Sequence, residues 1–305
     1  MLRIGAGLRP RMLLMLKCLV DDAPFELHDR LAYKFRHQLL DQPVLTLESL
    51  CKFIPSLPEK HVFYSKGLLK TQDNFDRAPK DHPNGLSIED TIENMRTSNS
   101  YIMVREPEIS PAFKDIHAAL IDDIREVIGR RGWGSRVLNP MLFLFVSSPN
   151  SVTPFHIDRA SNFLLQIRGS KTVTVFPPWD ERVVTQEESE RRLAYEGNPA
   201  WKPEHAALGH DFHFEPGEAI HIPFLAGHHV KNGPDDVSIS LSIFFNHQES
   251  ARRLRALMFN HHMRGPLGRL GMRPAPVAAN DFRDQLKSQT YRASSWLFKG
   301  LKKQA

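Results

Sequence analysis

The sequence predicts a mainly β protein in which an antiparallel sandwich or barrel is flanked by helices. Between residues 141 and 245, short apolar runs rich in strand-forming residues alternate with turn signals at residues 168–170, 215–217 and 232–234. Several short strands spaced in this way favour an antiparallel β core. No regular alternation of strands with long helices, which would indicate a parallel sheet, is found there.

Each expected element follows from the spacing of apolar residues. Short apolar runs predict strands, whereas apolar residues three or four positions apart predict amphipathic helices. The expected strands cover residues 61–64, 101–104, 141–146, 152–158, 162–167, 172–176, 219–222, 229–231 and 237–245. The expected helices cover residues 88–95, 113–128, 186–195, 250–263 and 280–301, after a helical N-terminal part at residues 24–56. Residues 180–213 form a polar insertion, with the helix at residues 186–195 and then a loop that contains Trp201. Such an insertion often acts as a lid or a substrate contact.

The charge distribution separates a C-terminal extension from the main domain. Residues 251–305 contain 12 Lys or Arg and 2 Asp or Glu, which explains the basic pI of about 9.2. A basic segment is usually a solvated face, although it can also contact nucleic acid, an anionic surface or a partner subunit. We therefore expect a disordered N-terminal segment at residues 1–23, the β domain at residues 24–250 and a basic helical extension at residues 251–305.

Cysteine usage and missing motifs narrow the class of protein. The two cysteines, Cys18 and Cys51, argue against a disulfide framework and against a cluster of thiolate metal ligands. This usage fits a reducing compartment, and we expect the protein in the cytoplasm. No apolar run approaches the roughly 20 residues that span a bilayer, so no membrane partner is expected. The motifs of kinases, of common serine hydrolases and of zinc proteases are not found.

An H-x-D triplet, His156 and Asp158, lies on one of the expected strands. Residues two apart on a strand point to the same face, so both side chains can contact one metal ion. Two imidazoles and one carboxylate hold ferrous ions while leaving positions free for a co-substrate and O₂. We expect the third ligand at His228, with His229 as the alternative, because adjacent strand residues face opposite ways. The sequence therefore indicates oxygen chemistry at an iron site.

Lys171 stands at the start of an expected strand, directly after the turn at Gly169. A dicarboxylate that chelates iron through a keto acid needs a cation at its far end, and Lys171 can provide it. Thr153 could donate a hydrogen bond to the same carboxylate. Taken alone, Lys171 would be interpreted as an exposed lysine at a strand end. His213 and His247 begin H-x-E triplets that could bind metal, but neither triplet is followed by a matching strand, turn and histidine, so both are left out of the site. The remaining histidines to be placed are expected to be surface or core groups: His210, His221, His261 and His262.

With these residues in view, the segment 153–178 resembles the cupin-like, jumonji-C branch of iron- and 2-oxoglutarate-dependent dioxygenases, most of all its asparaginyl hydroxylases. The pattern Thr-Pro-x-His-x-Asp, then Asn-Phe, then Gln-Ile-x-Gly-x-Lys and Phe-Pro-Pro, is present without a gap. The resemblance is strong over residues 140–246 and looser over residues 24–139. It implies a double-stranded β-helix, which is a distorted jelly roll, with helices around it.

The resemblance also implies roles for individual residues. It implies Fe(II) at His156, Asp158 and His228, and 2-oxoglutarate at Lys171 and Thr153, with Asn162 and Ser242 beside the co-substrate. The implied activity is hydroxylation of a protein side chain or of a small molecule, with O₂ and 2-oxoglutarate consumed. The alternative is a cupin-like regulatory or binding protein without catalysis. Helical extensions in relatives can support a homodimer, and a nucleic-acid partner is not expected.

Overall fold

A computed structural model describes residues 16–20 and 24–301, with side chains up to residue 294. The strands are β1 Tyr33–Arg36, β2 Val62–Lys66, β3 Ser100–Arg105, β4 Leu138–Ser147, β5 Val152–Ile157, β6 Ser161–Arg168, β7 Lys171–Val175, β8 His210–Phe214, β9 Glu218–Ile222, β10 Gly227–Asn232 and β11 Ser238–Asn246. The α-helices are α1 Leu47–Phe53, α2 Ala78–Asp81, α3 Ile88–Glu93, α4 Pro111–Arg130, α5 Gln186–Leu193, α6 Gln248–Gly268 and α7 Asp281–Leu301.

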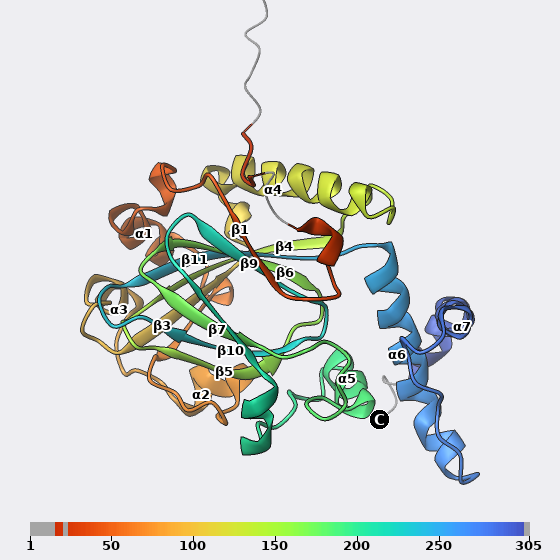
Figure 1. Ribbon diagram of the computed structural model, residues 1–305. Helices are drawn as coiled ribbons and strands as arrows, with labels where there is room; N and C mark the ends of the chain where they lie inside the picture. The colour runs from red at the N-terminus through yellow and green to blue at the C-terminus, as the bar shows by residue number, and fades with distance from the viewer. Residues whose placement is uncertain (1–15, 21–23, 302–305) are drawn as a thin grey trace, which may run out of the picture.

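Two antiparallel sheets face each other and form the centre of the molecule (Figure 1). The larger sheet has seven strands in the order β1-β9-β6-β11-β4-β3-β2, and the smaller has four in the order β5-β10-β7-β8. Apolar side chains from both sheets meet between them, for example Leu164 and Ile222 from the larger sheet with Val173 and Val230 from the smaller. The predicted antiparallel sandwich with flanking helices is therefore confirmed.

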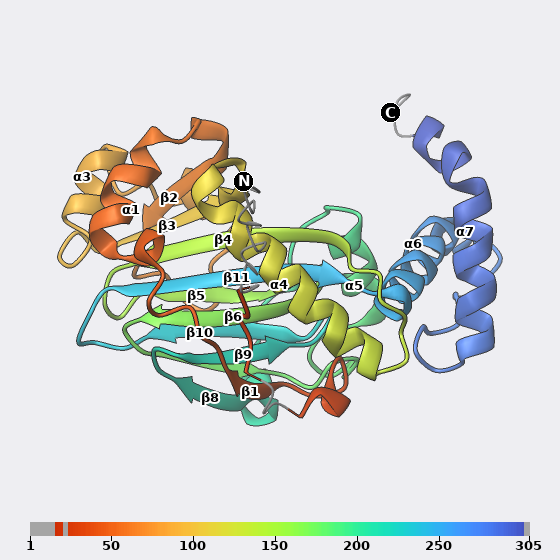
Figure 2. The ribbon, with the colours of Figure 1, turned by 90° about the horizontal axis from the view of Figure 1, so that it is seen from above.

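The long helix α4 covers the outer face of the larger sheet (Figure 2). Ser110 caps its first turn by accepting a hydrogen bond from the amide of Ala112. Ile116, Leu120 and Ile124 recur at helical spacing, and all three are buried in the cluster that includes the strands of this sheet. Burial of this stripe fixes α4 on the outer face of the larger sheet.

Two expectations about secondary structure are wrong. The helical N-terminal part at residues 24–56 contains β1, which pairs with β9 and places Tyr33 and Phe35 in the core. Alternating burial over four residues is a strand pattern that the leucine-rich context concealed. The insertion at residues 180–213 ends in β8 rather than in a loop, because its polar sequence pairs along the edge of the smaller sheet.

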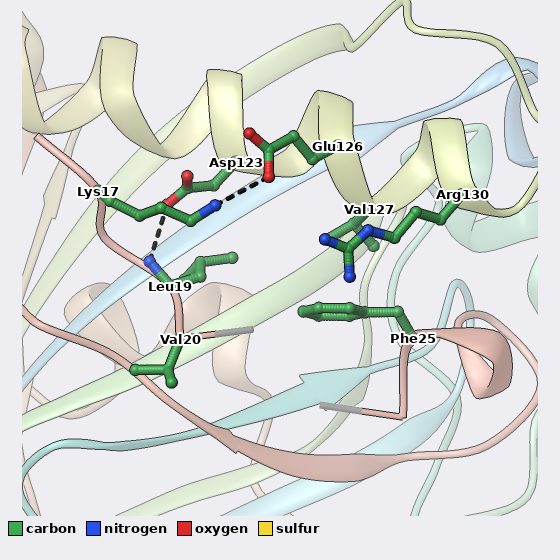
Figure 3. A pocket seen from close by; sticks show the side chains of 8 residues that line it. All are labelled: Lys17, Leu19, Val20, Phe25, Asp123, Glu126, Val127 and Arg130. Carbon is green, nitrogen blue, oxygen red and sulfur yellow. Dashed lines mark hydrogen bonds and ion pairs between the residues drawn. The ribbon is translucent and has the colours of Figure 1, made fainter. Parts of the chain in front are cut away.

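Residues 16–20 pack on α4, so the expectation of a disordered N-terminal segment is wrong for this part. Cys18 and Leu19 are buried, and both of their amides donate to Asp123 at 2.8 and 2.7 Å. Figure 3 shows Leu19 bonded to Asp123, and Lys17 paired with Glu126. Burial raises the pKa of the Cys18 thiol to about 12, which makes it a packing group. Residues 1–15 and 21–23 lie outside the described residues.

Helices α6 and α7 lie side by side at one end of the β sandwich (Figure 2). They correspond to the helices expected at residues 250–263 and 280–301. Arg264 of α6 ties this pair to α5 through a 2.6 Å ion pair with the buried carboxylate of Glu190. Within residues 16–20 and 24–301, no helix is both long and apolar enough to cross a membrane.

Candidate metal centre

The three predicted ligands come together where β5 and β10 pair. His156 on β5 lies directly opposite His228 on β10, with ring centroids 4.1 Å apart. Asp158, just past the end of β5, places Oδ1 3.9 Å from His156 Nε2 and Oδ2 3.5 Å from His228 Nε2. One ligand atom from each residue lies within 4.8 Å of the others, and all three side chains are buried. This is a convergent two-histidine, one-carboxylate face.

Hydrogen bonds fix which ring nitrogen of each histidine is free. His156 Nδ1 lies 2.8 Å from the carbonyl of Pro154, and His228 Nδ1 lies 3.0 Å from that of Ala226. A carbonyl can only accept, so each Nδ1 carries the hydrogen and each Nε2 keeps its lone pair. Such carbonyl partners typically orient metal-binding histidines. Both Nε2 atoms therefore point at Asp158 in the protonation state that a cation requires.

The carboxylate of Asp158 is held from behind by Asn162. The Asn162 amide donates to Asp158 Oδ2 at 3.3 Å, while its oxygen accepts from the Ser242 hydroxyl. Ser242 is fully buried and does not line the cavity, so its expected contact with the co-substrate is replaced by a contact with Asn162. Burial raises the pKa of Asp158, and burial next to His228 lowers that of His156 well below its usual range.

His229, the alternative third ligand, points away from this centre. Its half-buried ring packs against Trp201 at 5.4 Å and against Phe176 at 6.2 Å, on the opposite face of β10. The alternation of strand side chains thus separates the two adjacent histidines. Among the described residues, His228 is the one that can complete the face.

A cavity of about 700 Å³ opens from the three ligands and contains Thr153, Asn162 and Lys171. The Lys171 side chain is 4% exposed, and its ammonium has no hydrogen bond or ion pair among the described residues. Burial lowers its pKa to about 7. A buried lysine without a carboxylate partner is costly to the fold, which favours a role in holding an anionic ligand.

Tyr101 is a cavity residue that the sequence interpretation missed. It lies on β3, its hydroxyl is close to Thr153, and burial raises its pKa. Its hydroxyl is therefore a donor at neutral pH, next to the hydroxyl of Thr153 and in the same cavity as Lys171. The only sequence signal was its place at the start of an expected strand, and this did not indicate which cavity it faces.

The space beside His228 is tightly filled, so Gly227→Ala should weaken binding of a metal ion at the His-Asp-His face and destabilise the fold by about 1–3 kcal/mol. A Cβ on Gly227 would lie 2.8 Å from the ring of Phe155, and relief of this overlap would displace His228. Gly129→Ala on α4 is the matched control, because its Cβ meets open space. Thermal unfolding and Fe(II) titration measure both effects, and unchanged Fe(II) affinity in Gly227→Ala would contradict this reasoning.

A second cluster of histidines lies behind the centre and has a structural role. Asp29 accepts hydrogen bonds from Ser161 Oγ, from the amide of Phe224 at 2.9 Å and from His247 Nε2 at 2.6 Å. His221 is also buried and receives the amide of Asp29 at 3.0 Å. His28, Asp29 and His247 place ligand atoms within 4.8 Å. Because the carboxylate is already hydrogen-bonded on both oxygens, we interpret the group as a tie between strands.

Comparison with known proteins supports the fold and defines the class. A jelly roll of two antiparallel sheets with flanking helices carries the buried His-Asp-His face. A model of the cupin-like domain matches residues 66–251, and the chain belongs to that family. This confirms the predicted cupin-like fold.

Several solved structures are similar to this chain at low sequence identity. Two structures of the ribosomal oxygenase YcfD of Escherichia coli are 12% and 14% identical to this chain, each with a TM-score of 0.46. The matches cover 87% and 92% of this chain, and 61% and 68% of the YcfD chains. Oxalate decarboxylase of Lactobacillus farciminis is 20% identical with a TM-score of 0.25, over 36% of this chain. This chain spans 25% of the length of that decarboxylase.

Proposed function

We propose that this protein is an Fe(II)- and 2-oxoglutarate-dependent oxygenase that hydroxylates a protein side chain or a small molecule. In that reaction O₂ and 2-oxoglutarate give succinate and CO₂, and one oxygen atom enters a C–H bond of the substrate. The cupin fold alone does not determine this activity. The observation that carries the proposal is the unpaired, buried Lys171 in the same cavity as a His-Asp-His face.

The donor set fits a ferrous ion. His156 and His228 would bind through Nε2 and Asp158 through a carboxylate oxygen, a combination that suits iron and leaves positions open. Iron bound there would supply the activation of O₂ for oxidation of the keto acid and the substrate. The chain itself fixes both imidazole rings through backbone carbonyls and turns the carboxylate through Asn162. These contacts keep the ligand atoms in place before an ion arrives.

Lys171, Thr153 and Tyr101 would hold the far carboxylate of 2-oxoglutarate. Their donors are an ammonium and two hydroxyls within one cavity. Lys171→Met should weaken 2-oxoglutarate binding roughly ten- to hundredfold, because a hydrogen bond to a charged group contributes about 1.5–3 kcal/mol. Iron affinity should be retained. Calorimetric titration of both ligands tests this, with Lys231→Met on the exposed face of β10 as the control.

The low pKa of Lys171 gives binding of the co-substrate a pH dependence. With a pKa of about 7, the amine is mostly neutral at pH 8. A bound carboxylate favours the charged form, so it raises the pKa and binding takes up a proton. Affinity should therefore fall as pH rises above about 7. Calorimetry at pH 8 in buffers of different ionisation enthalpy measures the proton uptake, and no uptake in the wild type would contradict the role of Lys171.

The alternative is a cupin-like regulatory or binding protein. Such a protein has no need to keep a buried lysine uncompensated next to three convergent ligands, which is why we favour catalysis. Cytoplasmic residence is part of the same proposal, because Cys18 and Cys51 are both free. The two functions differ in whether Fe(II) and 2-oxoglutarate form one complex.

We propose in addition a homodimer formed through α6 and α7. Phe282 and Leu286 on α7 and Leu270 in the preceding loop are 76%, 56% and 73% exposed. On α6, Leu254 and Met258 line the cavity, so they are not part of this exposed apolar surface. Phe282→Ser with Leu286→Ser should convert the dimer to a monomer in sedimentation velocity. A monomeric wild-type protein would overturn the assignment.

A further inference from the structure

We infer that the substrate is a small organic acid with an apolar body, and that Arg159 and Tyr195 bind its carboxylate at the cavity. This inference rests on the proposed oxygenase function, since it names the substrate class of the same site. It follows from the walls of the cavity, from the pairing of its charges, and from the conformation of Tyr195.

Most of the cavity wall is apolar. Aromatic and methionine side chains from the larger sheet form one side, among them Phe63, Met103, Met141, Phe143 and Phe244. Leu254 and Met258 of α6 and Tyr291 of α7 form part of another side. A volume of about 700 Å³ lies within the range of small-molecule sites. Such a wall favours an apolar or aryl body over a polar one.

Each charged residue that lines the cavity, with one exception, either has a partner in the protein or has a ligand in the proposed function. Arg192 bonds to Asp76 at 2.5 Å and to the carbonyl of Ile157 at 3.0 Å. Arg105 lies 3.7 Å from Glu106 and is 47% exposed. In the proposed function, Lys171 holds 2-oxoglutarate and Asp158 holds the metal. Among the described residues that line the cavity, only Arg159 remains as a cation without an anionic partner.

Arg159 is half-buried in the cavity wall, and part of its guanidinium is free to bind a ligand. Nη1 is buried and has no hydrogen-bond partner among the described residues. An arginine keeps its charge in such a place. Arg159 lines the same cavity as His156, Asp158 and His228, so an anion bound to it would share that cavity with the three predicted ligands.

Tyr195 supports the guanidinium from one side. Its ring centroid is 3.5 Å from the Arg159 guanidinium carbon, in a cation–π arrangement. Tyr195 directly follows the C-cap of α5 with φ of 65°, a left-handed position that usually belongs to glycine. The residue is 79% exposed, so core packing does not explain a tyrosine in this conformation. Stacking on Arg159 does explain it.

One guanidinium balances one negative charge, and its planar fork matches a carboxylate. A phosphate monoester would bring close to two negative charges for a single unpaired cation. We therefore assign the anionic group as a carboxylate. The apolar body extends along the aromatic wall, and the C–H bond to be oxidised lies toward His156 and His228.

The test is designed so that it needs neither metal nor co-substrate. In metal-free, full-length Lys171→Met protein, Arg159 is the one unpaired cation that the described residues leave in the cavity. Isothermal titration compares 4-phenylbutanoate, its amide and 3-phenylpropyl phosphate as probes. The acid should bind at least about tenfold more tightly than the amide, and more tightly than the phosphate. Arg159→Gln should abolish the preference for the acid, and Arg105→Gln should preserve it.

Several results would overturn the inference. Equal affinity for acid and amide, no binding of any probe, or an acid preference that survives Arg159→Gln would remove Arg159 from the site. Tighter binding of the phosphate would overturn the carboxylate assignment. Tyr195→Phe should keep the acid preference and Tyr195→Ala should reduce it, which tests stacking without altering the charge. A failed titration with Fe(II) and 2-oxoglutarate would overturn the oxygenase proposal, and with it the role of the acid as an oxygenase substrate. It would leave the carboxylate site at Arg159 standing, because the probe measurements need neither metal nor co-substrate.

Discussion

Replacing His156 with alanine should abolish measurable Fe(II) binding while leaving the protein folded. The change removes one of three ligands and leaves His228 and Asp158 as an incomplete face. Loss of a hydrogen-bond partner behind a ligand costs ten- to a hundredfold in metal affinity, so loss of the ligand itself should cost at least about a hundredfold. Anaerobic calorimetric titration with Fe(II) measures the effect, and circular dichroism confirms the fold.

Two histidines provide matched controls. His213→Ala removes an exposed histidine of an H-x-E triplet on β8 and should leave Fe(II) affinity unchanged. His229→Ala removes the neighbour of His228 whose ring faces Trp201, and should also retain binding. Wild-type affinity in His156→Ala, or loss of binding in His229→Ala with the fold intact, would show that the metal is held elsewhere.

Replacing Asp29 with alanine should destabilise the protein by about 3–5 kcal/mol. The carboxylate is buried, and it joins the start of β6 through Ser161, the segment before β10 through Phe224 and the start of α6 through His247. Its loss leaves a buried amide and a buried imidazole without their partner. Denaturant unfolding measures the change, and Asp41→Ala, an exposed carboxylate, should stay within about 0.5 kcal/mol.

The contribution of Asp29 to the free energy of unfolding should decrease in strong acid. Burial alone would raise the pKa of Asp29, but the neighbouring imidazoles of His28, His221 and His247 hold it well below the usual range. A depressed folded-state pKa means that the stabilisation is complete above the unfolded pKa and is lost as pH falls through the folded one. The stability difference between wild type and Asp29→Ala should therefore be constant near neutrality and shrink in strong acid. A difference that grows with acidification would contradict this assignment.

The convergence of His156, Asp158 and His228 could be predicted because it follows from local rules. His156 and Asp158 share one face of a short strand, and the turn and strand before His228 lead back to the same sheet. Backbone pairing of β5 with β10 then brings His228 opposite His156. The choice between His228 and His229 needed the register of β10, which the sequence left open.

Other features depend on contacts between distant segments and carry no local signal. Asp29 lies 132 residues before Ser161, and Tyr101 reaches Thr153 from another sheet. The alternation in β1 was concealed by a leucine-rich context, and β8 by its polarity. The contact between Arg159 and Tyr195 depends on where the end of α5 lies relative to the cavity. Tertiary packing decided each of these positions.

The most direct test of the proposed function is anaerobic visible absorption of the metal-free protein, titrated first with Fe(II) and then with 2-oxoglutarate. A charge-transfer band that requires both additions and is absent in His156→Ala is the predicted result. It would show that the metal ligands and the Lys171 end of the cavity act on one complex. A folded wild-type protein that gives no such band would contradict the oxygenase proposal and favour a cupin-like binding protein.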